Sequence, residues 1–483
     1  MPCGTLSAIE CKFDVVESTV SPSFEGLAAV ARVERMPAQA LDFAYYDTVG
    51  RDLAVRHITL RRCTGGADPG WHLTLPTDSP TVLRASLDDE VPAELRDVVL
   101  AIVRDRPLAV VARISTTRTV DCLYGADGTP LAEFADEELT AWADGREADR
   151  WREWRLELSS YGHRELLDRL TNRLLDAGAH RAGEGSTLAR VLDGPTSEPL
   201  SRVVDDPVHR AVAEEVENLL VWDRAVRADV DDSVHQMRVT TRKIRSLLQA
   251  SESAFGLSDD AWVLDELRQL ASVLGIARDA EVLAARYQKA LDELPAELVR
   301  GPVRERLVEG SRRRYRSGWR KSVAAMRSQR YFRLLDALEG LVAAELQELE
   351  PGSEQPSDTT VASGYERVRK RAKETKKAQA EHRDEALHRI RKAAKRLRYT
   401  AGATGDTKIA GAAKDIQSLL GDHQDSVVSR TYLSQQADAA HAAREDTFTY
   451  GLLYEREGEL ARQSREQLAP ALKALKKAAR KEL

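Results

Sequence analysis

A histidine and three arginines recur at helical spacing in VHQMRVTTRKIRS, residues 234–246. Each residue of an α-helix turns the side chain by about 100°, which brings four polar side chains into an arc of roughly 80°. They are His235, Arg238, Arg242 and Arg245. Guanidinium groups bind phosphate oxygens by charge-assisted hydrogen bonds, and an imidazolium adds a pH-sensitive donor. The segment therefore predicts a helix with one face suited to a phosphate-rich anion.

The same pattern returns 153 residues later in LHRIRKAAKRLRY, residues 387–399. Its equivalent polar side chains are His388, Arg391, Lys395 and Arg398, and further cations flank the two faces at Lys243, Lys392 and Arg396. Apolar residues occupy the opposite sides of the helices, at Met237, Ile244, Ile390 and Leu397. We expect each helix to bury its apolar side and to expose its basic side, Arg238 and Arg391 included.

A second pair of segments follows the two basic helices in the same order. LASVLGIARDAEVL and IQSLLGDHQDSVV both contain L-G-x-x-x-D, with Asp279 and Asp425 offset by 146 residues. Two repeats of a helical bundle, related by a pseudo-twofold axis, would place the basic faces across a common groove. A groove lined from both sides can surround a long anion, which one helix cannot.

Other uses of these residues are less well supported. Each basic face could simply be solvated or pair with neighbouring acids, but the duplication in register counts against this. His235 and His388 have an arginine three residues later instead of a second metal ligand, which disfavours a metal site. The motifs GxxxxGK[ST], HExxH and GxSxG are absent. Aromatic residues make up 5% of the chain and none lies on either basic face, which disfavours stacking on nucleic-acid bases.

The length, composition and charge of the chain limit the number of domains, the class of protein and the kind of partner. A chain of 483 residues predicts two or three domains, and 42% hydrophobic residues are enough for real cores. Residues 1–200 contain 22 Lys and Arg against 33 Asp and Glu, whereas residues 361–400 contain 14 against 5. The basic cluster favours a polyanionic partner. We find no run of about 20 apolar residues, no signal peptide and no CxxC pair, so we expect a cytoplasmic protein without a membrane partner.

The two halves of the chain differ in the secondary structure that their sequence patterns predict. Before residue 195, alternating segments predict strands in ITLRR, WHLTLP, ARISTTRTVDCLY, PLAEFADEEL and WREWRLELSS. ELLDRLTNRLLDAG predicts an amphipathic helix ended by Gly178. After residue 207 long helical periodicities take over. GPTSEPLSRVVDDP predicts a linker between the halves, and EPGSEQPSD predicts a connector between two helical repeats.

The paired basic segments, the paired L-G-x-x-x-D segments and SQRYFRLLDAL at 328–338 resemble the CHAD family, the conserved-histidine α-helical domain. The resemblance covers residues 200–478 and implies two helical repeats, about 205–345 and 360–478, around a basic groove that binds inorganic polyphosphate. It assigns this role to the residues that match the family's motifs and their flanks, namely His235, Arg238, Arg242, Lys243, Arg245, His388, Arg391, Lys392, Lys395, Arg396 and Arg398.

Residues 5–195 resemble the CYTH family, the triphosphate-tunnel domain, through IECKFDV, YYDTVGRDLAVRHITLRR and GWHLTLP. The resemblance implies a closed antiparallel β-barrel, in which basic residues bind triphosphate and glutamates hold a divalent metal for hydrolysis. The matching tunnel residues are Glu10, Lys12, Arg61, Arg113, Arg118, Glu153 and Glu157.

The chain departs from the CYTH pattern at several ligand positions. Ala8 replaces the first glutamate of the opening ExExK signature, and Arg155 stands where another acid is expected. Thr74 and Thr187 stand where lysines are usual. Losing metal ligands harms hydrolysis more than folding. We predict a degenerate barrel with weak or absent triphosphatase activity and no required cofactor, and a divalent cation at this domain stays open as an alternative.

The sequence thus predicts an α+β multidomain protein. An N-terminal antiparallel β-barrel of the triphosphate-tunnel type precedes an all-α domain of two pseudo-twofold-related helical bundles. We expect the protein to bind inorganic polyphosphate, and association with polyphosphate granules would extend that role. The first alternative is an active metal-dependent triphosphatase, acting on tripolyphosphate or a nucleoside triphosphate, whose CHAD domain captures the substrate. The second is a nucleic-acid-binding or scaffold protein.

Overall fold

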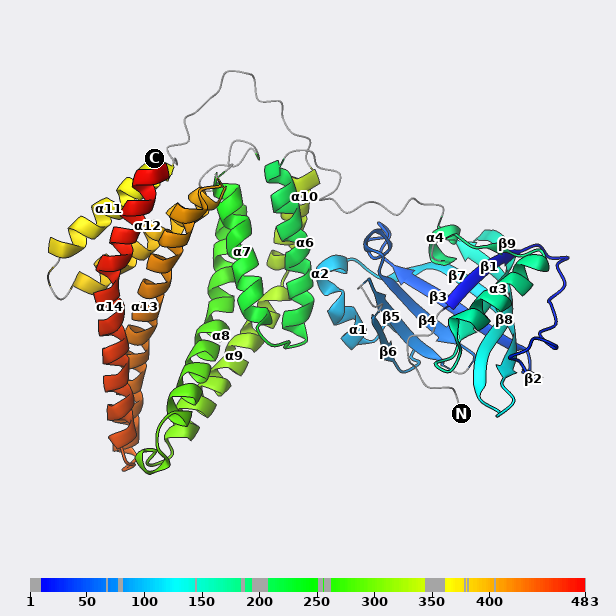
Figure 1. The fold of residues 1–483 in the computed structure, drawn as a ribbon, viewed down its shortest axis with the longest axis horizontal. Coiled ribbons are helices and arrows are strands. Elements are labelled where there is room, and N and C mark those ends of the chain that lie inside the picture. Colours follow the sequence, from blue (N-terminus) through cyan, green and yellow to red (C-terminus); the bar gives the residue numbers. More distant parts are fainter. Residues whose placement is uncertain are drawn as a thin grey trace, which may run out of the picture. The chain divides into compact units, whose positions relative to one another are not determined.

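The computed structural model of the chain (Figure 1) describes residues 10–66, 68–76, 81–143, 146–183, 187–192, 207–250, 255, 262–343, 361–377, 379, 382–403 and 405–482. Ala8, almost all of the predicted linker and the predicted connector EPGSEQPSD lie outside the described residues. The chain forms two compact units. The first takes in residues 1–271 and 323–345, and the second takes in residues 272–322 and 346–483. These limits do not follow the predicted domains, 5–195 and 200–478, which stay a prediction.

The N-terminal part of the first unit is a large antiparallel sheet. Its strands follow the order β10-β1-β9-β8-β7-β3-β4-β5-β6, and β2 pairs with β7 beside this path. The strands are β1 (Glu10–Val15), β2 (Arg32–Arg35), β3 (Gln39–Asp47), β4 (Thr59–Thr64), β5 (Gly70–Leu75), β6 (Thr81–Ala85), β7 (Ala109–Tyr124), β8 (Pro130–Ala143), β9 (Arg146–Leu158) and β10 (His180–Arg181). All five predicted strand segments are confirmed within β4, β5, β7, β8 and β9.

The predicted antiparallel architecture is confirmed, but the closure of the barrel is not. The path of described strands has two ends, β10 and β6, and these strands do not pair with each other. A barrel closes only when its edge strands are hydrogen-bonded to one another. Since β10 contributes just His180 and Arg181, both paired with β1, the sheet stays open in the part of the chain that the structure describes.

Short helices complete the sheet domain. They are η1 (Ala54–Arg56), α1 (Ala93–Val98), α2 (Leu100–Val103), α3 (Arg164–Asp176) and α4 (Thr187–Val191). The predicted amphipathic helix is α3, and Gly178 after it has a φ of +97°, a backbone conformation that glycine adopts without strain. On one sheet face Phe13, Phe134 and Trp154 are buried in the same cluster as the leucines of α3. On the opposite face α4 covers an apolar region that contains Ile114 and Trp151.

After residue 207 the described residues form helices, most of them long, and the predicted all-α region is confirmed. They are α6 (Pro207–Arg227), α7 (Ser233–Ala250), α8 (Trp262–Asp292), η2 (Ala296–Leu298), the π-helical η3 (Glu305–Glu309), α9 (Gly310–Met326), α10 (Gln329–Ala343), α11 (Val361–Lys377), α12 (Arg383–Ala403), α13 (Thr407–Ala442) and α14 (Phe448–Glu482). Among the described helices, none combines the length and apolar character that a membrane span requires.

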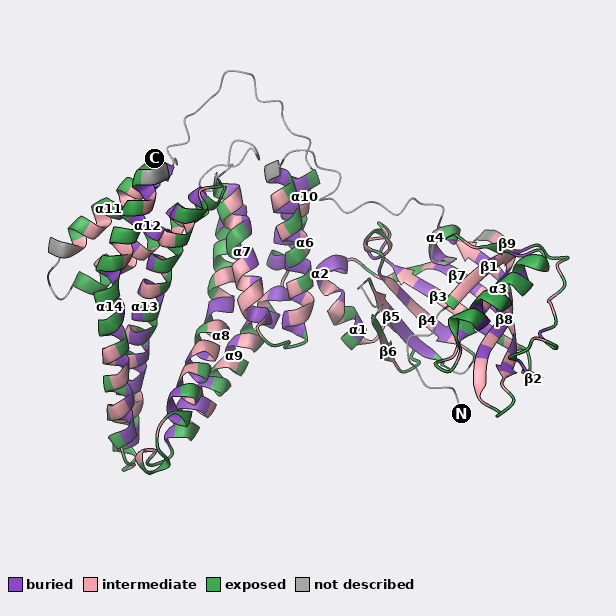
Figure 2. Ribbon diagram, in the orientation of Figure 1, coloured by how far each residue is buried: buried purple, intermediate pink, exposed green. Residues whose placement is uncertain are grey.

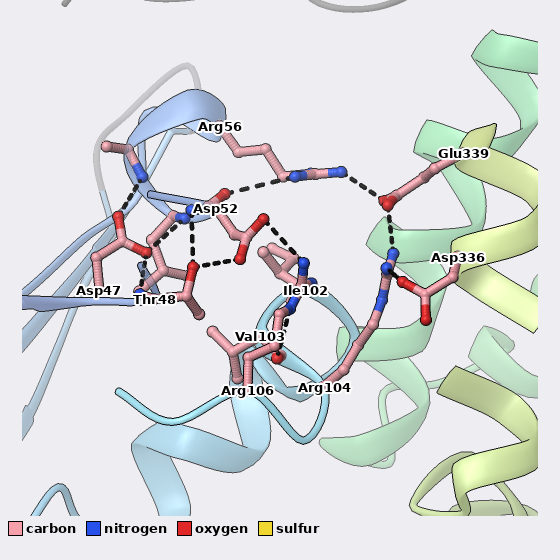
Figure 3. Close-up of polar contacts among 12 residues, drawn as sticks. Asp47, Thr48, Asp52, Arg56, Ile102, Val103, Arg104, Arg106, Asp336 and Glu339 are labelled. Carbon is pink, nitrogen blue, oxygen red and sulfur yellow. Dashed lines mark hydrogen bonds and ion pairs between the residues drawn. The ribbon is translucent and has the colours of Figure 1, made fainter. Parts of the chain in front are cut away.

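Ion pairs join the sheet domain to the helices of the first unit, where α1 and α2 contact α6 (Figure 1), and two of the arginines in these pairs, Arg104 and Arg227, are buried. Figure 3 shows Arg104, at the end of α2, pointing at Asp336 and Glu339 of α10, with the Glu339 carboxylate 2.5 Å from its Nη2. Arg56 pairs with the same Glu339 at 2.6 Å. In the reverse direction, Arg227 of α6 pairs with Asp97 of α1 at 3.1 Å. The sheet domain thus contributes the buried Arg104, which pairs with acids of α10, and the helices contribute the buried Arg227, which pairs with Asp97 of the sheet domain.

The second unit contains a four-helix bundle. Helices α11, α12, α13 and α14 bury one apolar cluster that includes Val368, Ile390, Leu397 and Ile416. A neighbouring cluster packs the later part of α8 against α13 and α14 through Leu283, Tyr287, Leu433 and Leu453. The bundle thus rests on apolar contacts between helices, as hydrophobic periodicity predicts.

Candidate anion-binding site

The basic face of α7 is built as the spacing predicts. Met237, Ile244 and Leu248 are completely buried, which fixes the rotation of the helix. Arg242 and Lys243 are exposed, whereas His235, Arg238 and Arg245 are half-buried. The Arg238 Nε donates to the Ala271 carbonyl oxygen of α8 at 3.3 Å, and the Lys243 Nζ lies 2.9 Å from Glu215 of α6.

The basic face of α12 has the same construction. Ile390 and Leu397 are buried, Lys392 and Arg396 are exposed, and His388, Arg391, Lys395 and Arg398 are half-buried. The Arg398 Nη1 donates to the Gln417 side chain of α13 at 3.2 Å. Its guanidinium and the Lys395 ammonium both lie over the Tyr399 ring, 4.9 and 5.6 Å from the centroid.

The burial classes of the two helices repeat at the offset of 153 residues. Figure 2 shows buried, intermediate and exposed positions along α7. Val234, Met237 and Ile244 match Leu387, Ile390 and Leu397 as buried positions, and the histidines match as half-buried ones. The expectation that Arg238 and Arg391 are exposed was wrong. Both stand next to a buried apolar residue on the helix, and their guanidinium groups lie against the neighbouring helix, that of Arg238 at Ala271 of α8 and that of Arg391 at Gly421 of α13.

The L-G-x-x-x-D segments repeat in structure as well. Leu274, Gly275 and Asp279 have the burial classes of Leu420, Gly421 and Asp425, with the leucine and glycine buried and the aspartate exposed. In the second unit the guanidinium of Arg391 lies beside this glycine of α13. A Cβ on Gly421 would be 3.5 Å from the Arg391 Nη2, which is an ordinary van der Waals contact.

Acidic side chains of both segments gather near Arg391 within the second unit. Partial burial raises the pKa of Asp425, the charges of Arg391 and Arg286 oppose the rise, and the nearby carboxylates of Asp422 and Asp279 add to it. Arg286 also holds Ser426 at 2.8 Å and the buried Glu457 at 2.6 Å. Sequence reasoning missed Arg286 and Glu457, because an arginine and a glutamate 171 residues apart carry no local signal.

The tunnel residues predicted in the sheet domain lie mostly on one face. Strand register places Glu10 opposite Glu157 and Lys12 opposite Arg155, while Arg118 is opposite Glu137. Directly opposite residues of antiparallel strands point to the same side of a sheet. We call this side the charged face, and it carries Glu10, Lys12, Arg61, Glu133, Glu137, Arg118, Glu153, Arg155 and Glu157.

Arg113 is the exception among the predicted tunnel residues. It lies five positions before Arg118 on β7, and the pairing with β3 is regular between them, so the two arginines point to opposite faces. Arg113 is exposed there, opposite Ala44 and Trp142. Arg61 does belong to the charged face, and its guanidinium lies 5.0 Å from the centroid of the Phe43 ring.

The charged face does not offer an open set of metal ligands. The Arg155 guanidinium lies 3.3 Å from Glu10, 3.3 Å from Glu137 and 3.5 Å from Glu153. Among the described residues, no group of three or more His, Cys, Asp or Glu side chains is arranged to hold a metal ion. The donor set does not fit a resident divalent cation, since a cationic side chain already lies between its carboxylates.

Comparison with known proteins agrees with the two repeated segments. Residues 210–434 match the family model described as CHAD domain. Two curated proteins of Mycobacterium tuberculosis are similar, the uncharacterized protein MT2285 of strain CDC 1551 / Oshkosh and the uncharacterized protein Rv2226 of strain H37Rv. Each is 59% identical over 499 residues, which cover 98% of this chain and 97% of the relative. The chain belongs to their family and contains a CHAD domain.

Solved structures similar to the chain match either about 57–58% of it or about 39% of it. The CHAD domain from the plant Ricinus communis is 23% identical, with a TM-score of 0.41, over 58% of this chain and 91% of its own. PptA from Streptomyces chartreusis is 15% identical, with a TM-score of 0.44, over 57% and 100%. The putative adenylyl cyclase HpAC1 from Hippeastrum, described as having a dominant triphosphatase activity, is 17% identical, with a TM-score of 0.25, over 39% and 96%.

The histidine of the second repeat of this CHAD domain has an unusual environment. Burial lowers the pKa of His388, and the cations Lys392 and Arg391 lower it further. Its Nδ1 is buried without a hydrogen-bond partner. Both effects disfavour the protonated imidazole in the free protein, whereas an anion on the basic face would favour it.

Proposed function

We propose that this CHAD-domain protein binds inorganic polyphosphate through the basic faces of α7 and α12. Their binding groups are the eleven residues that the family resemblance implicates, and the guanidinium of one of them, Arg391, lies beside Gly421 of α13. The observation that carries the proposal is the repeat of both residue type and burial along the two helices. That the two faces border one groove stays a prediction from the sequence repeats.

The chemistry of the faces favours a ligand made of phosphate. Arginine and lysine recognise phosphate oxygens without needing bases or sugars. Nucleic-acid bases stack on exposed aromatic side chains. The basic side of α7 has none among residues 234–246, and on α12 the ring of the exposed Tyr399 is already in contact with Lys395 and Arg398. Polyphosphate repeats the same anionic unit along its length, which matches a face of cations at regular helical spacing. Cytoplasmic location and association with polyphosphate granules belong to the same proposal.

The sheet domain is proposed to be a CYTH-like domain without efficient hydrolysis. Arg155 neutralises the glutamates that would otherwise be free to hold a divalent cation. An active triphosphatase is the second candidate, and it is favoured by the basic residues that the charged face retains, Lys12, Arg61 and Arg118. In that case the helical domain would capture the substrate.

A titration of the full-length protein tests the proposal. Long-chain polyphosphate, tripolyphosphate and single-stranded RNA are compared at several salt concentrations, and we expect long-chain polyphosphate to bind most tightly at each of them. Tighter binding of RNA at every salt concentration would overturn the proposal. Phosphate release from tripolyphosphate in Mg²⁺ or Mn²⁺ separates the two candidates, because robust turnover that Glu10→Gln abolishes would establish the triphosphatase.

A further inference from the structure

Five glutamates from three neighbouring strands share the charged face of the sheet. Glu157 of β9 lies between Glu10 of β1 and Glu133 of β8 in the strand register. Glu137 of β8 lies opposite Glu153 of β9. Opposite side chains of paired strands have Cβ atoms about 4.5–5.5 Å apart, so like charges at these positions repel one another. Such a cluster is stable only if a cation lies among the carboxylates or if some of them are protonated.

Arg155 is the cation in the middle of this cluster. It lies between the two rows of glutamates on β9, opposite Lys12 on one side and the buried Ala135 on the other. The small side chain of Ala135 leaves space beside the arginine. From this position the guanidinium contacts carboxylates on β1, β8 and β9 at 3.3–3.5 Å. Arg118 adds a second cation 3.3 Å from Glu137.

The carboxylates remain electrostatically strained even with Arg155 present. Burial raises the pKa of Glu137, the nearby Glu153 adds to the rise, and Arg155 and Arg118 oppose it. Burial also raises the pKa of Glu157, and the carboxylates of Glu133 and Glu10 raise it further. The five carboxylates of the cluster thus lie close to one another, and Arg155 is among the cations that oppose the rise in the pKa of Glu137 and of Glu157.

We infer that Arg155 is a resident cation that excludes divalent metal ions from this cluster, and that removing its guanidinium opens a divalent-cation site held by Glu10, Glu137 and Glu153. The three carboxylates surround one guanidinium group, Glu10 at Nη1 and Glu137 and Glu153 at Nη2, and carboxylate oxygens are the ligands that Mg²⁺ and Mn²⁺ take. A fixed positive charge at that point repels a second cation. The presence or absence of the Arg155 side chain then decides whether the charged face binds a divalent metal ion.

The inference rests on one part of the proposed function, namely that the sheet domain does not hydrolyse triphosphate efficiently, and it does not depend on polyphosphate binding by the helices. Its test therefore uses no phosphate compound. Mn²⁺ is titrated into the full-length protein and free Mn²⁺ is followed by its electron paramagnetic resonance signal. Arg155→Gln is expected to bind one Mn²⁺ at least about tenfold more tightly than the wild type. Arg155→Lys keeps the charge and is expected to behave as the wild type does.

A second substitution assigns the new site to the cluster. Arg155→Gln combined with Glu137→Gln should lose the gain in Mn²⁺ affinity, because one of the three ligands is then missing. If Arg155→Gln does not fold in metal-free buffer, added Mn²⁺ should restore a thermal unfolding transition in the variant, while the melting temperature of the wild type should not change with Mn²⁺. The inference is overturned if wild type and Arg155→Gln bind Mn²⁺ equally, if the gain survives Glu137→Gln, or if Mn²⁺ does not stabilise an unfolded variant. Failure of polyphosphate binding would leave these outcomes unchanged, so the two proposals fail separately.

Discussion

Helices α7 and α12 present equivalent basic faces on supports of different chemistry. Helix α12 is held by an apolar cluster in which Leu387, Ile390 and Leu397 pack among α11, α13 and α14. Helix α7 buries an equivalent apolar side, but the helix packed against it, α6, is tied to the sheet domain by the buried Arg227. One repeat is stabilised by its own helices, and the other also depends on charges supplied by a different domain.

The difference shows that two helices can carry equivalent basic faces although the contacts that hold the helices in place differ. The face depends on local helical spacing, which both copies keep. The support depends on what each helix layer meets on its outer side. In the first unit that side meets α1 and α2, and the contact uses buried ion pairs whose partners cannot be removed singly without leaving an unpaired charge.

The largest expected effect breaks the support of α7. Arg227→Ala leaves the fully buried Asp223 and the Asp97 carboxylate without their shared cation. We expect the free energy of unfolding of the first unit to fall by about 3–5 kcal/mol, measured by denaturant titration. Arg327→Ala is the matched control, because Arg327 pairs with the same Asp97 from an exposed position and its loss should cost less than about 1 kcal/mol. Equal effects of the two changes would contradict the role of buried charge.

The next effect compares the two faces in ligand binding. Arg238→Glu and Arg391→Glu each remove a cation and add a repelling acid. The loss of one charge-assisted contact is worth about 1.5–3 kcal/mol, or roughly ten- to a hundredfold in affinity, and reversal should exceed this loss. Polyphosphate affinity is measured by titration calorimetry, and circular dichroism checks the fold because both arginines are half-buried.

Arg389→Glu is the control for charge reversal on α12. Arg389 is exposed and lies about 100° around the helix from His388, outside the basic face. Its reversal should change affinity much less than Arg391→Glu does. If reversal on one helix abolishes binding while reversal on the other has no effect, a single copy works and the second is a structural duplicate.

Salt dependence sharpens the comparison further. When several cationic side chains bind a chain of phosphates, the counterions of the phosphates are released. The logarithm of the affinity should therefore fall linearly with the logarithm of the salt concentration. If both helices contribute contacts, the slope for Arg238→Glu and for Arg391→Glu should each be smaller than that of the wild type. An unchanged slope in either variant would assign all ion contacts to the other helix.

The smallest expected effect concerns His388. Burial and nearby cations lower its pKa in the free protein, whereas a bound polyanion would raise it, so binding takes up a proton. Affinity should therefore increase as the pH falls from 8 to 6, and His388→Ala should remove part of that increase. We expect the change to stay below about tenfold, measured by titration at both pH values. If His388→Ala lowers the affinity by the same factor at pH 6 and at pH 8, protonation of the imidazole does not contribute to binding.

Much of the fold could be predicted because its signals are local. The alternation in WREWRLELSS and ARISTTRTVDCLY predicted β9 and β7, and the helical spacing of apolar residues predicted α7 and α12. Gly178 correctly marked the end of α3. Closure of the barrel could not be read from the chain, because it depends on whether β10 and β6 meet, which is a matter of register and strand length across the whole sheet.

The sequence by itself determined the two basic faces, since a helix converts residue spacing directly into a stripe of side chains. It also identified Arg155 as out of place among acids, but not what the arginine contacts. Only the tertiary structure brought Glu10, Glu137 and Glu153 around one guanidinium, because strand pairing joins residues that are far apart in the chain. The same holds for Arg104 and Asp336, 232 residues apart, whose pairing depends on how the sheet domain docks on α10. Local geometry follows from neighbouring residues, whereas a buried charge finds its partner only when distant elements have packed.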